Sequence, residues 1–247
     1  MLYVDDLKVF AASEAKLNTV LRATSTAMQD IGLQWNPKKC TVIHVRRRNQ
    51  VEDAADLKLD KATLVKKHKA ESMYKFLGVK ESTLQDEKLA LAVAANVFLH
   101  RLSVIWMSPL SDANRGKGTN QFTLPFLTYP MCTQHWPLAE LKEIDRETRT
   151  LVSGNGGKHL LSSTVMLYLP RVAGGRGMRS VEHEYKVIKI KAAIKLYMNP
   201  DPMIRSVRVF EERAAERGLA SLVKDAHRSA EELVTTLTLE PAESKKI

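Results

Sequence analysis

The stretch that most constrains the fold of this chain lies at its start, where two adjacent carboxylates interrupt an apolar run. Residues 1–11 read Met-Leu-Tyr-Val-Asp-Asp-Leu-Lys-Val-Phe-Ala. After the carboxylates, the side chains alternate in the way typical of a strand with one buried face. Aspartate also tolerates the tight backbone of a turn. The sequence therefore predicts a β-hairpin with Asp5 and Asp6 at its tip and a second strand that continues from Leu7 to Ala11.

An amphipathic helix is predicted next, over residues 13–31, where apolar side chains recur on one helical face. Ser13 suits the N-cap position, and Gly32 suits the left-handed residue that follows a helix. We expect this helix to cover one face of a sheet. Residues 32–40 then read Gly-Leu-Gln-Trp-Asn-Pro-Lys-Lys-Cys, and a strand is predicted at 41–45.

Taken in order, these motifs resemble the reverse transcriptases of non-LTR retrotransposons. Tyr-x-Asp-Asp at residues 3–6 matches the catalytic hairpin signature of that family, and residues 32–40 match its fourth palm motif. Phe-Leu-Gly at 76–78 matches its primer-grip motif. Residues 140–184 follow a pattern common downstream of such domains. The resemblance covers most of the chain.

The resemblance implies an α+β fold, with a partial polymerase palm of antiparallel strands and a helix, then a mostly helical thumb and helical extension. The implied domains are the palm at 1–80, a thumb-like region at 81–153, a basic Gly-rich and then helical extension at 154–239, and a disordered tail at 240–247.

The implied activity is RNA-directed DNA synthesis by two-metal nucleotidyl transfer, with Mg²⁺ or Mn²⁺ as the cofactor. The two divalent ions stand roughly 3.5–4 Å apart, and Mg²⁺ prefers carboxylate oxygens. By resemblance, Asp5 is a metal ligand, Asp6 is its less directly bound neighbour, and Tyr3 and Val4 lie near the primer end. Lys39 matches a proposed proton donor to the departing pyrophosphate, although a solvated turn lysine explains the position equally well.

Two more segments are implied to contact the primer or other nucleic acid. The first is the primer grip, Phe76, Leu77 and Gly78, for which a simple edge hairpin remains an alternative. The second is a Gly-rich segment that carries three arginines, whose guanidinium groups form bidentate forks suited to phosphate. The alternative there is a Gly-rich hairpin with ordinary surface arginines. The three arginines are Arg171, Arg176 and Arg179.

From about residue 86 the pattern becomes helical. A helix is predicted from Asp86 to about Trp106, followed by a polar loop at 111–118 and helices at 120–136 and from Trp136. Trp106, Phe126 and Tyr129 are expected to be core residues and not base-stacking platforms. Three more helices are predicted at residues 182–198, 204–218 and 219–236.

Composition favours a polyanionic partner. The 247 residues carry a formal charge of +10, and the pI is about 9.6. Four lysines make the predicted helix at 182–198 strongly basic: Lys186, Lys189, Lys191 and Lys195. Two unpatterned cysteines fit a reducing compartment. The longest apolar run, at residues 89–99, is too short to cross a membrane. We therefore expect an intracellular protein, in cytoplasm or nucleus. The charge alone fits either nucleic acid or an anionic membrane surface, and the resemblance implies that the partners are RNA template and DNA primer and no membrane.

The family also needs fingers and a third metal-binding aspartate on a strand upstream of the hairpin, and neither pattern precedes Tyr3. We therefore expect no polymerisation by this chain alone, and a partner that supplies those parts, either the missing N-terminal portion or another chain. A non-catalytic nucleic-acid-binding remnant is the main alternative. A receiver-type signalling domain is a remote one, because such domains pass from an Asp-Asp pair directly into a helix.

Overall fold

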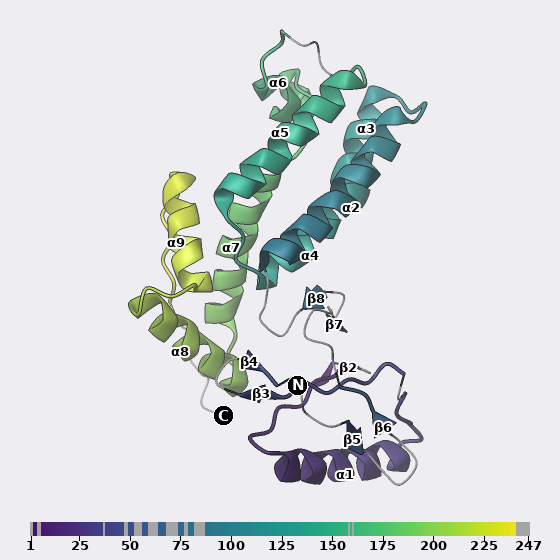
Figure 1. The fold of residues 1–247 in the computed structure, drawn as a ribbon. Coiled ribbons are helices and arrows are strands. Elements are labelled where there is room, and N and C mark those ends of the chain that lie inside the picture. Colours follow the sequence, from purple (N-terminus) through teal and green to yellow (C-terminus); the bar gives the residue numbers. More distant parts are fainter. Residues whose placement is uncertain are drawn as a thin grey trace. The chain divides into compact units, whose positions relative to one another are not determined.

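The chain folds into two compact units, Met1–Asp86 and Glu87–Ile247, in the computed structural model (Figure 1). Each unit is described by itself. Small antiparallel hairpins and many helices make the fold α+β, as the sequence predicted at that level. The structure describes residues 2–3, 6–36, 38–46, 49–51, 56–58, 64–67, 74–76, 79–81, 87–157, 159 and 161–240.

The first unit contains one helix, α1 (Glu14–Asp30), within its described residues. The Ser13 hydroxyl accepts a hydrogen bond from the Lys16 N–H at 3.4 Å, which satisfies one of the free N–H groups of the first turn. Gly32 follows the helix with φ of +75°, a conformation that glycine adopts without strain. The predicted helix at 13–31 and both of its end signals are confirmed.

The strands of this unit are short and form four separate two-stranded hairpins among the described residues. Three apolar residues on or beside them form a small core, on which Leu17 and Leu21 of α1 pack. The core residues are Val42, Leu57 and Val65. The hairpins pair β1 (Leu2–Tyr3) with β2 (Asp6–Leu7), β3 (Val45–Arg46) with β4 (Asn49–Gln50), β5 (Leu57–Lys58) with β6 (Leu64–Val65), and β7 (Tyr74–Phe76) with β8 (Val79–Glu81).

Two strand predictions were too long. The second strand of the first hairpin ends at Leu7 and does not continue to Ala11. On one face of the alternating pattern Val9 is only half-buried and Ala11 is exposed, and on the other face Phe10 is exposed, so neither face is buried there. In the predicted strand at 41–45, Val42 makes only an isolated parallel bridge to Lys67, and regular strand begins at Val45. An alternating pattern forms a strand only where a neighbouring strand is available to pair with it, and the pattern alone does not show where that is.

The second unit is helical throughout its described residues. It consists of α2 (Glu87–Met107), α3 (Asp112–Gly118), a π-helical turn η1 (Thr119–Thr123), α4 (Pro125–Thr133), α5 (Leu138–Gly154), α6 (Val165–Tyr168), a 3₁₀ turn η2 (Arg171–Ala173), α7 (Val181–Met198), α8 (Pro202–Glu216) and α9 (Leu222–Glu232). All the helices predicted from residue 86 onward are present.

The predicted polar loop at 111–118 was wrong, because most of it is α3. The Ser111 hydroxyl caps this helix by accepting a hydrogen bond from the Asn114 N–H at 3.4 Å. Gly116 is buried, and a Cβ added there would lie 3.4 Å from the Arg176 carbonyl oxygen. Glycines have low helix propensity, so the local sequence disfavours this helix. Close packing against a distant segment therefore stabilises it.

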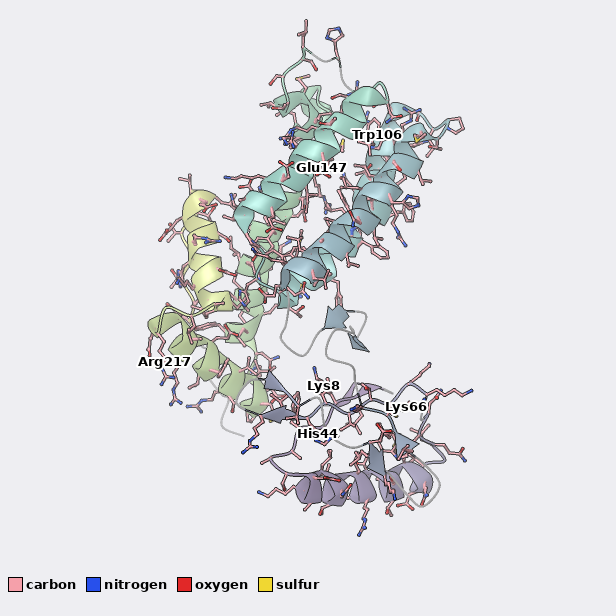
Figure 2. The ribbon with its side chains drawn as sticks, in the orientation of Figure 1. Lys8, His44, Lys66, Trp106, Glu147 and Arg217 are labelled. Carbon is pink, nitrogen blue, oxygen red and sulfur yellow. The ribbon has the colours of Figure 1, made fainter. Side chains whose placement is uncertain are left out.

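One core joins the predicted thumb-like region and the predicted extension. Helices α2, α4, α5 and α7 pack together (Figure 1), and residues on both sides of position 154 share the same apolar cluster. Trp106 is buried near the C-terminal end of α2 (Figure 2), where its indole N–H donates to the Thr119 hydroxyl at 3.0 Å. Helices α8 and α9 pack on α7.

Helix α2 is long and apolar enough to cross a membrane by length and composition alone, the single such helix in the described part of the chain. The sequence analysis missed this property because it considered only the uninterrupted apolar run at 89–99. Core helices of soluble proteins meet the same criterion, and Phe98, Leu102 and Trp106 of α2 are buried in the core.

Replacing Gly157 by alanine should destabilise the second unit. A Cβ at this position would lie 2.2 Å from Cζ3 of Trp106 and 2.5 Å from Cγ1 of Val152, so the indole must move. We expect Gly157→Ala to lower the free energy of unfolding by about 1–3 kcal/mol, the usual cost of overpacking a core, measured by urea denaturation followed by circular dichroism.

Gly154→Ala is the matched control, because a Cβ there meets nothing within 4 Å and alanine favours the last turn of α5. Equal free energies of unfolding for the two variants would contradict the close packing of Gly157 against the Trp106 indole.

Candidate nucleic-acid interface

The N-terminal hairpin has the pairing that the sequence predicted. Strands β1 and β2 are antiparallel, and Tyr3 is the direct partner of Asp6. Val4 and Asp5 stand between these partners in the sequence but lie outside the described residues. The predicted hairpin is thus confirmed, but Asp6 is a strand residue of β2 and not part of the tip, where it was predicted. The direction of the carboxylates stays a prediction.

The primer-grip motif also falls on a hairpin. Strands β7 and β8 are antiparallel, and Phe76 is paired with Val79. Leu77 and Gly78 lie outside the described residues. Among the described residues, no strand pairing joins this hairpin to the N-terminal one. The structure is compatible with the simple hairpin that the sequence analysis kept as an alternative.

Lys39 lies in a tight turn after α1. Asn36 opens this turn, and its carbonyl accepts hydrogen bonds from the N–H groups of Lys39 at 2.9 Å and Cys40 at 3.2 Å. The Trp35 indole donates to the Ser25 hydroxyl at 2.8 Å and so fixes the turn against α1. The Lys39 side chain is exposed, which fits a solvated lysine and equally a lysine that meets a phosphate.

The donor chemistry of the hairpin suits Mg²⁺ or Mn²⁺, because Asp5 and Asp6 offer adjacent hard carboxylates. Asp5 lies outside the described residues. Among the residues that the structure does describe, no group of three or more His, Cys, Asp or Glu is placed to hold a metal ion.

The glycines of the Gly-rich segment serve the local fold. A Cβ at Gly175 would lie 2.1 Å from the Leu169 carbonyl oxygen, so only glycine fits. Gly174 and Gly177 have φ of +80° and +66°. The Gly177 N–H donates to the Leu169 carbonyl at 2.8 Å, and the Arg176 N–H donates to the Met166 carbonyl at 2.9 Å. The chain folds back on α6, which explains the glycines without a phosphate.

Two of the three arginines in this segment share one carboxylate. A guanidinium nitrogen of Arg171 lies 3.2 Å from Asp112, at the start of α3, and Arg176 forms an ion pair with the other oxygen of the same carboxylate. Arg179 is more exposed, with its Nε 3.6 Å from Glu184. The structure therefore brings Arg171 and Arg176 together around Asp112 and leaves Arg179 more open to a phosphate.

A buried carboxylate, which the sequence analysis did not single out, anchors the start of α7. Asp145 of α5 accepts hydrogen bonds from the Ser180 hydroxyl at 2.7 Å, the Val181 N–H at 2.8 Å and the Glu182 N–H at 3.1 Å. The Val181 and Glu182 N–H groups are among the free N–H groups at the positive end of the helix. The interaction joins residues about 36 apart, and no local pattern signals it.

Two of the four lysines that make α7 basic are buried. Lys186 is buried, and its Nζ lies 2.6 Å from Glu182 and 2.8 Å from Glu232 of α9. Lys189 is 1% exposed, whereas Lys191 is exposed. The two inward lysines follow each other at a spacing of three residues, so one face of the helix carries them against α9.

Lys189 belongs to a cluster of polar side chains between α7, α9 and the loop before α5. Its Nζ donates to the Gln134 carbonyl at 2.7 Å and lies 4.0 Å from Asp225. The Asp225 carboxylate lies 2.7 Å from Nδ1 of His135 and accepts a hydrogen bond from the Tyr185 hydroxyl at 3.4 Å. This cluster attaches α9 to the bundle.

Burial and charge shift the pKa values within this cluster. Burial lowers the pKa of Lys189 and, with the charge of Asp225, raises the pKa of the Tyr185 phenol. Burial alone would raise the pKa of Asp225, but the hydrogen bond and charge of His135, with the charge of Lys189, hold it below its usual range.

The aromatic side chains do not all lie in the core. Trp106 is buried as predicted, whereas the predictions for Phe126 and Tyr129 were wrong, because both are exposed. Helix α4 buries Leu127 and Met131, and Phe126 and Tyr129 therefore fall on its opposite face. The sequence predicted a helix here but assigned no buried face to it.

Comparison with known proteins adds no relative: no protein-family model matches the chain, and no curated protein matches its sequence.

We expect Asp225→Asn to lower the free energy of unfolding by about 1–3 kcal/mol at pH 7, because it leaves the buried Lys189 ammonium without its counter-charge. The lowered pKa of Asp225 means that its contribution is complete above its unfolded pKa, near 4, and is lost as the pH falls through the folded value. The stability difference between wild type and variant should therefore narrow below about pH 4.

Urea denaturation at pH 7 and pH 3 measures this difference. Glu143→Gln provides the control, since Glu143 is exposed and, among the described residues, its ion pair is with Arg146 on its own helix. A difference for Asp225→Asn that is the same at both pH values would contradict a native carboxylate held ionised by its neighbours.

Proposed function

We propose that the chain is part of an RNA-directed DNA polymerase of the kind encoded by non-LTR retrotransposons. The observation that carries the proposal is the register of the first hairpin, in which Tyr3 pairs with Asp6 in the motif Tyr-Val-Asp-Asp. A hairpin in this register offers adjacent carboxylates from a hydrogen-bonded base. Such a base is what a metal site of fixed geometry needs.

In the proposed reaction, the primer 3′-hydroxyl loses its proton to solvent and attacks the α-phosphate of a deoxynucleoside triphosphate. A new P–O bond forms, the bond from the α-phosphorus to the bridging oxygen of the β-phosphate breaks, and pyrophosphate leaves. Asp5 and Asp6 would hold divalent ions, whose charge would favour the deprotonated hydroxyl and offset the triphosphate charge, and Tyr3 and Val4 would border the primer end. Lys39, which is exposed on its turn, gives a proton to the leaving pyrophosphate.

Two further features support a nucleic-acid substrate. The formal charge of +10 favours a polyanion. A second hairpin, at Phe76, follows the first one at the distance that the resemblance leads us to expect. In this proposal, the fingers and the third metal-binding aspartate come from residues outside 1–247, so the chain alone binds a primer–template and metal but does not extend the primer.

The metal part of the proposal is tested by titrating Mn²⁺ into the chain bound to an RNA–DNA primer–template, with electron paramagnetic resonance to count free Mn²⁺. We expect Asp5→Asn/Asp6→Asn to weaken Mn²⁺ binding at least about tenfold, because each amide replaces a charged ligand of a hard cation. Asp30→Asn, at the exposed C-terminal end of α1, is the control.

Primer extension on the RNA template with the same samples tests the catalytic part. Incorporation that the double variant abolishes would show that the chain needs no other part, and would overturn our assignment of the missing ligand. Unchanged Mn²⁺ binding in the double variant would overturn the assignment of Asp5 and Asp6 themselves.

A second candidate function, duplex binding without catalysis, is favoured by the open position of Arg179. Affinity for an RNA–DNA duplex, measured by fluorescence anisotropy across a KCl series, should fall as salt rises. We expect Arg179→Gln to reduce the slope of log K against log salt by about 0.9, the value for one phosphate contact.

Arg171→Gln and Arg176→Gln should reduce that slope less, because the two guanidinium groups share the Asp112 carboxylate, whose single negative charge offsets one of their two positive charges. Equal effects of all three substitutions would contradict this distinction. An affinity that does not depend on salt would remove phosphate binding altogether.

A further inference from the structure

Three aromatic rings stand in a row on the outer face of the helix formed by η1 and α4. Phe122, Phe126 and Tyr129 are 68%, 44% and 49% exposed. They are spaced four and three residues apart, so they follow one another along a single helical face. Large exposed aromatic groups at this spacing are costly for a purely structural helix, which points to a binding role for the face.

The helix that carries the rings is held firmly from behind. Leu124, Leu127 and Met131 on the opposite face are buried in the main core. The segment continues from α3 without a break, and the Leu124 N–H donates to the Thr119 carbonyl at 3.0 Å, five residues earlier. π-Helical turns of this kind are frequent at functional sites. The rings are therefore presented from a fixed backbone.

Helix α2 adds a cation to the row. The guanidinium carbon of Arg101 lies 3.5 Å from the centroid of the Phe126 ring, and its Nη1 donates to the Phe122 carbonyl at 3.5 Å. Arg101 is itself exposed. An arginine stacked on an aromatic ring is held in place, so less entropy is lost when it meets an anion.

The sequence around the row is poor in acidic residues. From Lys88 to Ala139 it contains one, Asp112, and that carboxylate is already paired with Arg171 and Arg176. Arg101 is the cation that the structure places on the row. A nucleic acid would complement both features, since it combines phosphates with bases that stack on aromatic rings.

We propose that Phe122, Phe126, Tyr129 and Arg101 form a binding surface for single-stranded nucleic acid, on which bases stack against the rings and Arg101 contacts the backbone phosphate. Exposed aromatic rings beside a basic surface are the recognised physical basis of such binding, because each base offers a π-face regardless of sequence. The surface lies within the second unit and does not depend on a metal.

The test is fluorescence anisotropy of a labelled oligothymidylate, about 20 nucleotides long, with the full chain in EDTA. We expect each of Phe122→Ala, Phe126→Ala and Tyr129→Ala to weaken binding roughly 5- to 100-fold without changing the salt slope, since stacking carries no charge. Arg101→Gln should reduce the slope by about 0.7, the value for one phosphate on a single strand.

Phe210→Ala is the matched control. Phe210 is a phenylalanine that is 70% exposed on α8, beside Glu211 and Glu212, and its removal should leave the affinity unchanged. Circular dichroism melting checks that all variants remain folded, which is expected because the rings are exposed.

The proposal is overturned if the triple alanine variant binds the oligonucleotide as wild type does. Two further measurements identify a different ligand. If the triple variant keeps its affinity for the oligonucleotide but no longer self-associates in sedimentation, the face contacts a second copy of the chain. If it keeps that affinity but no longer binds anionic vesicles, the face contacts a membrane. EDTA removes any contribution from metal at Asp5 and Asp6, so failure here leaves the polymerase proposal untouched.

Discussion

A single buried carboxylate holds the helical unit together. Asp145 sits on α5 but takes its three hydrogen bonds from the first residues of α7, the helix on which α4, α5, α8 and α9 all pack. A buried charge is costly unless such donors surround it, and the positive end of a helix supplies them at low cost. Because α7 enters the bundle at this point, Asp145 sets the direction of that helix. The Gly-rich segment just before Ser180 is placed by the same anchor.

The two units would offer different chemistry to the nucleic acid that we propose as their ligand. The first carries the adjacent aspartates in the segment of a short hairpin and an exposed lysine in the turn after α1. The second carries exposed rings on η1 and α4, whose opposite face is buried in the core, and arginines in the segment that leads into α7. The carboxylates would serve a metal site, whereas the helical face would suit contacts that tolerate many sequences. The proposals for the two units therefore rest on separate observations.

The helices were predictable because their signals are local. Ser13 and Gly32 mark the ends of α1, and the apolar pattern after Asp86 gives α2. The hairpins at Tyr3 and Phe76 were also found, but strand lengths were not, since a strand ends where its partner does. Helix α3, the inward direction of Lys186 and Lys189, and the outward direction of Phe126 all depend on what packs against them from elsewhere in the chain. The three arginines could be grouped from the sequence, but the ion pairs of Arg171 and Arg176 with Asp112 could not, because that carboxylate lies on a helix distant in the chain.

The π-helical turn at Thr119–Thr123 has a consequence for how this segment can change during evolution. A π-helical turn contains one more residue than the α-helical turn it replaces, and each residue of an α-helix turns the chain by about 100°. Loss of one residue there would rotate α4 relative to α3, so that the buried faces of Leu127 and Met131 would swing toward solvent while the rings moved inward. The length of this segment is therefore constrained as strictly as its composition, and single-residue insertions and deletions should be tolerated in the connections between helices and not here.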